Sequence, residues 1–115
     1  MEITERRVDK NLILVLSGRV DMVTADQLRD SLLPLVDQCA AAKESIVVDF
    51  SGVDYISSAG LRVLMLAAKQ AKTSGGKVAV AALQPVVLEI FQISRFDKVL
   101  DCYPQVQDAI NALAG

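Results

Sequence analysis

The stretch DFSGVDYISSAGLRVL, residues 49–64, decides the fold that this sequence predicts. It overlaps the run IVVDF of residues 46–50, which is typical of a strand covered on both faces. Residues 51–54 indicate a turn, and from Ser57 onward apolar residues recur at helical spacing until two glycines at 75–76 end the pattern. A buried strand, a short loop and a helix together form the basic unit of an α/β fold.

Strands and helices alternate on both sides of this stretch. Residues 3–8 and 12–16 indicate two strands joined near Asp9, close enough to pair as an antiparallel hairpin. Further strands are expected at residues 77–83 and 99–103, and further helices at residues 85–94 and after Pro104. The sequence therefore predicts one α/β domain over residues 1–115, with a mixed, mainly parallel sheet of about five strands and about four helices.

The first helix is predicted to begin after Thr24. Thr24 is expected to act as its N-cap, with Gln27 at the capping-box position. Pro34 is expected to kink this helix or break it locally. One buried face is indicated by an apolar stripe, consisting of Leu28, Leu32, Leu35, Val36 and Cys39.

The composition excludes several classes of function. A net charge of −2 and an aromatic content of 4% argue against nucleic-acid binding, which needs a positive field and often aromatic stacking. With no bilayer-spanning apolar run and no secretory signal, we expect a cytoplasmic protein without membrane insertion. The absence of histidine removes the commonest general base and metal ligand, so we expect neither an enzyme nor a metal site or cofactor. Cys39 and Cys102 lack metal-ligand spacing and are expected to be reduced, buried thiols, with a long-range disulfide as the alternative.

Two adjacent serines open the helix after the central strand. A helix N-terminus has unpaired N–H groups and a partial positive charge, so a phosphoserine there would be tolerated or favoured. The simpler interpretation is that Ser57 or Ser58 only caps the helix. Local chemistry alone leaves both interpretations open.

Three segments together resemble a known family. Gly18-Arg19-Val20-Asp21, followed by Thr24 and Ala25, is similar to a signature that precedes the first helix of the STAS domain. The second segment is residues 49–64, and the third is the 74–77 turn with the helix and loop that follow it. In order and spacing they resemble the STAS family, and within it the stand-alone anti-sigma factor antagonists of bacteria.

The resemblance implies a phosphorylation switch. A serine at the position of Ser58 would be phosphorylated by an anti-sigma factor with serine kinase activity, and a serine phosphatase of the metal-dependent type would reverse the modification. The unmodified protein would capture the anti-sigma factor and so release a sigma factor. The partner-binding residues implied in this way are Asp21, Thr24, Ser57, Ser58, Ala59, Gly60 and Arg62.

The chain departs from the family pattern at three positions. Many regulated members have aspartate where this chain has Ser57, a hydroxyl residue where it has Ala59, and glutamate where it has Arg19. Ser57 is therefore a second candidate acceptor, although alignment on the glycine at position 60 favours Ser58. The alternative function is a constitutive STAS scaffold, or a subunit of a signalling or membrane-associated complex, without phosphoswitching.

Overall fold

A five-stranded mixed sheet organises the chain, with strand order β1-β2-β3-β4-β5. The structure is a computed structural model that describes residues 1–114. Strands β1 and β2 pair antiparallel, and every later neighbouring pair is parallel. In chain order the elements are β1 (Glu2–Val8), β2 (Asn11–Val20), α1 (Ala25–Ala41), β3 (Ser45–Ile56), α2 (Ser58–Ser74), β4 (Val78–Ala81), α3 (Pro85–Ile93), the short 3-10 helix η1 (Phe96–Lys98), β5 (Asp101–Tyr103) and α4 (Val106–Ala114). The predicted fold class is confirmed.

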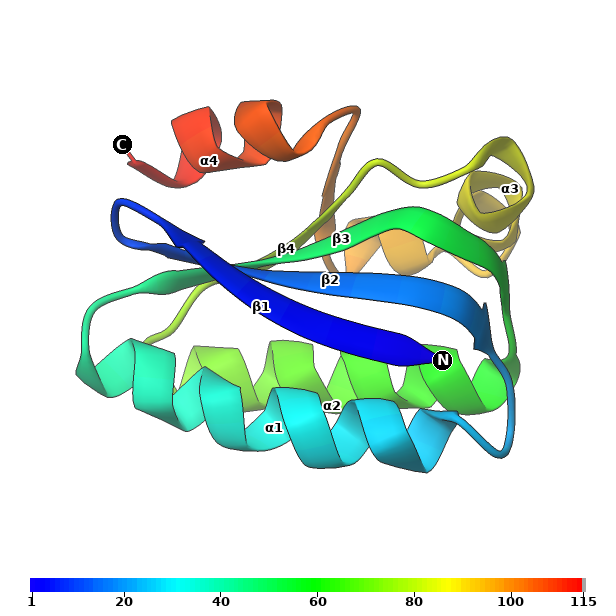
Figure 1. Ribbon diagram of the computed structural model, residues 1–115, viewed down its shortest axis with the longest axis horizontal. Coiled ribbons are helices and arrows are strands. Elements are labelled where there is room, and N and C mark those ends of the chain that lie inside the picture. Colours follow the sequence, from blue (N-terminus) through cyan, green and yellow to red (C-terminus); the bar gives the residue numbers. More distant parts are fainter. Residues whose placement is uncertain (115) are drawn as a thin grey trace.

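Helices cover both faces of this sheet, as Figure 1 shows. Helices α1 and α2 lie side by side against one face, and α4 covers part of the other. Alternate residues of β2 accordingly enter two cores: Leu14 belongs to the larger core, and Ile13 belongs to a smaller one beneath α4. This burial on both faces explains why the central strands appear in the sequence as nearly continuous apolar runs.

The predicted turn at residues 51–54 is wrong, because β3 continues to Ile56. The strand stays paired with β2 through two register shifts, and the Asp49 carboxylate accepts a hydrogen bond from the Ser51 amide at 2.9 Å. Gly52 permits close approach of the two strands, since a Cβ there would lie 2.9 Å from the Leu16 carbonyl oxygen. The extended strand delivers α2 to the carboxyl edge of the sheet.

Helix α1 passes through Pro34 from Ala25 to Ala41, so the predicted local break is wrong. Pro34 is exposed, and its ring therefore costs a backbone hydrogen bond without disturbing the core. The neighbouring carbonyl of Leu33 accepts a hydrogen bond from the Gln70 side chain of α2 at 2.8 Å. All five residues of the predicted apolar stripe are buried, and their packing holds the helix together across the proline.

Both cysteines are free thiols, as predicted. Cys39 is buried and Cys102 is half-buried. Burial raises the pKa of Cys102 to about 11 and also raises the pKa of Cys39. Both side chains are therefore poor nucleophiles at neutral pH.

Candidate functional site

Ser57 and Ser58 have different roles at the start of α2. Ser57 is the N-cap: its backbone is extended, and its side-chain oxygen accepts a hydrogen bond from the Gly60 amide at 3.3 Å. The Ser57 amide in turn donates to the Val20 carbonyl at 2.8 Å. Ser58 is the first residue of the helix, and its side chain is exposed. The capping function that the sequence left open between the two serines thus belongs to Ser57.

Gly60 lets the first turn of α2 pack against the strand ends. A Cβ at this position would lie 2.6 Å from Val20 Cγ1 and 2.8 Å from Ile56 Cγ1. Gly60 is buried, and Ala59 is half-buried against the larger core. Both residues were expected to contact a partner; Gly60 lies inside the fold, whereas Ala59 packs against the core and keeps part of its surface exposed.

Asp21 organises the loop between β2 and α1. Its Oδ1 atom accepts hydrogen bonds from the amides of Val23 at 3.0 Å and Thr24 at 2.9 Å. Hydrogen bonds from the Thr24 amide and hydroxyl, then from the Val23 amide, hold the pKa of Asp21 below its ordinary value, and the charge of Arg19 adds to this effect. The Asp21 carboxylate thus stabilises the conformation of its own loop.

The predicted capping box at Thr24 and Gln27 is wrong. Thr24 occupies the N-cap position but has helical dihedral angles, and its side chain makes no capping bond. Its hydroxyl instead lies 2.8 Å from the Arg19 carbonyl, and the Gln27 side chain donates to the Met1 carbonyl at 3.0 Å. The Thr24 hydroxyl oxygen also accepts a hydrogen bond from the Asp21 amide at 2.9 Å, so this side chain is engaged within its own loop and does not cap α1.

The same loop exposes two large apolar side chains. Met22 is 79% exposed and Val23 is 83% exposed. The sequence interpretation missed both, although two apolar residues between the turn residues Asp21 and Thr24 were an available signal. Apolar side chains exposed next to each other in a polar loop are typical of a contact with another protein.

These features lie on one end of the molecule, which we call the carboxyl-edge surface. It consists of Asp21, Met22 and Val23 from the β2–α1 loop, and Ser58 and Arg62 from α2. Figure 1 shows the β2–α1 loop beside the start of α2, where β2 and β3 end. Arg62 is exposed one helical turn after Ser58. Of the seven residues predicted to bind a partner, Ser58, Arg62 and the Asp21 loop face this surface, while Gly60 is buried.

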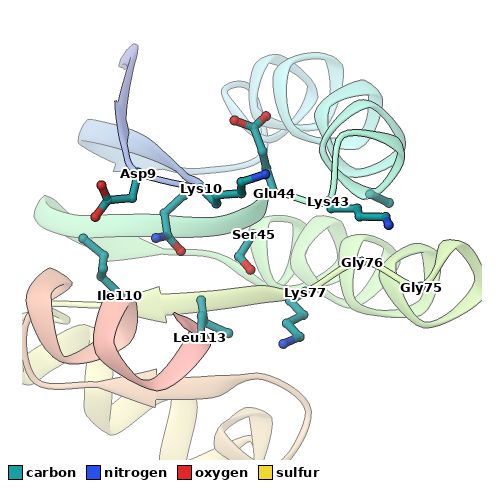
Figure 2. A pocket seen from close by; sticks show the side chains of 12 residues that line it. Asp9, Lys10, Lys43, Glu44, Ser45, Gly75, Gly76, Lys77, Ile110 and Leu113 are labelled. Atoms are coloured by element: carbon teal, nitrogen blue, oxygen red, sulfur yellow. The ribbon is translucent and has the colours of Figure 1, made fainter. Parts of the chain in front are cut away.

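A cavity of about 450 Å³ lies at the opposite end of the sheet. Figure 2 shows that the side chains of Lys43 and Lys77 point away from each other around it. Helices α1 and α2 end here, and lysines complement the partial negative charge of helix C-termini. Within residues 1–114, no group of three or more histidine, cysteine, aspartate or glutamate side chains could hold a metal ion. The carboxyl-edge surface is therefore the stronger candidate site.

Comparison with known proteins places this arrangement in a family. The family model described as the STAS domain matches residues 2–109. The chain belongs to the STAS domain family. The family match thus includes the whole carboxyl-edge surface, together with all five strands.

Relatives within the STAS family share both sequence and fold with this chain. The Bordetella bronchiseptica protein BtrV, whose name describes an anti-sigma factor antagonist, is 41% identical over 84% of this chain and 80% of its own length. A crystal structure of an anti-sigma factor antagonist from Mycobacterium paratuberculosis matches with a TM-score of 0.83 and 25% identity, covering 99% of this chain and 94% of that one. A Thermotoga maritima crystal structure has the same fold, with a TM-score of 0.88 at 18% identity, covering 98% and 95% of the two chains.

None of the helices in residues 1–114 has both the length and the apolar character needed to cross a bilayer.

Proposed function

We propose that this chain is an anti-sigma factor antagonist that is switched by phosphorylation of Ser58. Unmodified, it captures an anti-sigma factor with serine kinase activity and thereby releases a sigma factor. The kinase phosphorylates Ser58, and a metal-dependent serine phosphatase restores binding. The chain acts as a one-domain binding protein in the cytoplasm and has no catalytic role of its own. The exposed position of Ser58, directly after the capping serine and beside the Asp21 loop, is the observation that carries this proposal.

A phosphate at Ser58 is compatible with the fold. The group adds about −1.5 to −2 charges at neutral pH. At the first position of α2 this charge faces the positive end of the helix, which stabilises an exposed anion by about 0.3–1 kcal/mol. Because the Ser58 side chain is exposed, no core group has to move to admit the phosphate.

The same phosphate would oppose docking. Two like unit charges about 4 Å apart repel by about 4 kcal/mol at an effective dielectric constant of about 20. That free energy corresponds to nearly a thousandfold loss of affinity. One modification is therefore nearly neutral for folding and decisive for binding wherever the partner brings acidic groups to the carboxyl-edge surface.

Ser57 is the weaker acceptor for structural reasons. Its side-chain oxygen holds the Gly60 amide, and the residue is half-buried. Phosphorylation of Ser57 would have to replace this cap, whereas phosphorylation of Ser58 leaves it in place.

The proposal is tested by phosphate mapping. The chain is incubated with ATP and, one at a time, with each serine-kinase anti-sigma factor encoded in the same genome, and its intact mass is then measured. We expect one added phosphate on the wild type and on Ser57→Ala, mapped to residue 58, and none on Ser58→Ala. Wild-type protein that gains no phosphate from any of these kinases would contradict the switch and favour the constitutive scaffold.

A further inference from the structure

The end of β2 carries an arginine that is held in place before any partner binds. Arg19 and Tyr55 are cross-strand neighbours in the β2–β3 ladder, and the guanidinium carbon of Arg19 lies 4.5 Å from the centre of the Tyr55 ring. Arg19 is exposed, while Tyr55 is half-buried. A cation at this distance over an aromatic ring is attracted by the ring quadrupole, so the stack restricts an otherwise flexible side chain.

Two hydrogen bonds to backbone carbonyls connect the end of β2 to the carboxyl-edge surface. The Arg19 carbonyl lies 2.8 Å from the hydroxyl of Thr24, in the loop that exposes Met22 and Val23. The carbonyl of the next residue, Val20, accepts a hydrogen bond from the Ser57 amide at 2.8 Å. The backbone at the end of β2 therefore borders both the apolar loop and the start of α2.

The guanidinium of Arg19 makes no ion pair within the described residues 1–114, although its charge acts on the Asp21 carboxylate. The ion pairs among residues 1–114 involve Arg7 and Arg29 but not Arg19. The acid nearest in the loop, Asp21, directs its Oδ1 atom to the Val23 and Thr24 amides. The charge of Arg19 is thus available to another molecule.

We propose that the Arg19–Tyr55 stack is a specificity contact for a partner protein that presents an aspartate or glutamate at this edge. The inference rests on the proposed function and adds the charge of the partner surface to it. A guanidinium that stacks one face on an aromatic ring still has free N–H groups along its edge. These groups can donate two parallel hydrogen bonds to a single carboxylate. Because the stack orders the side chain in advance, docking costs less conformational entropy.

The same acidic feature would account for the switch. A partner surface acidic enough to pair with Arg19 would also be repelled by the charge of a phosphate on Ser58. Arg62, exposed one helical turn after Ser58, adds a second positive charge that favours an acidic partner. The acidic partner is then attracted before modification and repelled after it.

The experiment measures binding of the anti-sigma factor that phosphorylates the wild-type chain. Affinity and association rate are determined at low and high salt for wild type, Arg19→Glu, Arg19→Lys and Tyr55→Leu, with circular dichroism to confirm folding. We expect Arg19→Glu to bind at least about tenfold more weakly and to lose much of the salt dependence of association. Arg19→Lys should recover affinity only in part, because an ammonium group cannot make the paired contact.

A matched control separates this contact from net charge. Arg6→Glu makes the same charge change at an exposed position of β1 opposite Ile13, about 20 Å from Arg19 along β2 at roughly 3.3 Å per residue. It should change affinity less than about twofold, as expected for a charge outside the interface. Arginine is then introduced at each exposed acidic residue of the anti-sigma factor in turn, and one of these variants should restore binding to Arg19→Glu.

The outcomes separate this inference from the proposed function. If wild type binds and Arg19→Glu behaves like Arg6→Glu, the specificity contact is wrong and the proposed function stands. If a folded wild-type chain binds none of the anti-sigma factors, the proposed function fails, and the inference that rests on it fails as well.

Discussion

At the scale of single residues, two neighbouring serines differ because of one hydrogen bond. The oxygen of Ser57 accepts the Gly60 amide, whereas Ser58, one position later, faces solvent. The residue that stabilises the helix is therefore distinct from the residue proposed to carry the phosphate. This division lets the surface change its charge while the cap stays intact.

Replacing the capping serine should cost stability without removing the phosphorylation site. Ser57→Ala leaves the Gly60 amide without its acceptor and is expected to lower the free energy of unfolding by about 1 kcal/mol. Ser58→Ala, the matched control, should change it by less than about 0.5 kcal/mol. Urea denaturation measures both values. A larger loss for Ser58→Ala than for Ser57→Ala would mean that the cap has been assigned to the wrong serine.

Asp21 makes stability depend on pH in a defined direction. Hydrogen bonds from Thr24 and Val23 lower its pKa in the folded state below the unfolded value. The stability that the Asp21 carboxylate contributes is therefore present at pH values above its pKa in the unfolded state. This stability is lost as the pH falls through its pKa in the folded state. We expect Asp21→Asn to lose less stability than wild type between pH 5 and pH 3, about the range in which carboxylates titrate, as measured by urea denaturation. Parallel losses in the two proteins would contradict the proposed role of the carboxylate.

At the scale of elements, periodicity predicted the order of strands and helices but not the extent of β3. The glycine and polar residues at 51–54 indicate a turn locally, and only the pairing with β2 shows why Gly52 is needed inside a strand. Thr24 looked like a cap for a similar reason, because a local pattern does not show that its hydroxyl bonds the Arg19 carbonyl and the Asp21 amide instead. Residue spacing alone does not show pairing with a neighbouring strand or hydrogen bonds made within a loop.

Helix α1 contains a proline that its surroundings tolerate, so removing it should stabilise the fold. Alanine restores a backbone amide, and proline is about 3 kcal/mol less favourable than alanine in a helix interior. Since proline also restricts the unfolded chain, the expected net gain for Pro34→Ala is about 1–2 kcal/mol in the free energy of unfolding. Gln38→Ala, exposed on the same helix, is the control and should stay within about 0.5 kcal/mol. A loss of stability in Pro34→Ala would show that α1 needs the proline to pack against the sheet.

At the scale of the whole molecule, the parallel sheet brings distant segments to one edge. The loop after β2 and the start of α2 meet there because both follow the carboxyl ends of neighbouring parallel strands, joined by the bond between the Ser57 amide and the Val20 carbonyl. The resemblance to the STAS family indicated Ser58 and Asp21 from the sequence. The apolar pair Met22 and Val23 was a signal that the sequence interpretation missed, whereas the stacked Arg19 required coordinates, because its role depends on a cross-strand neighbour.

The most direct test compares the chain with itself carrying phosphoserine at position 58. Its affinity for the anti-sigma kinase and its free energy of unfolding are measured in both forms. We predict an affinity lower by up to about a thousandfold and a free energy of unfolding unchanged within about 1 kcal/mol. Equal affinity in the two forms, or a phosphorylated chain that no longer folds, would contradict the account.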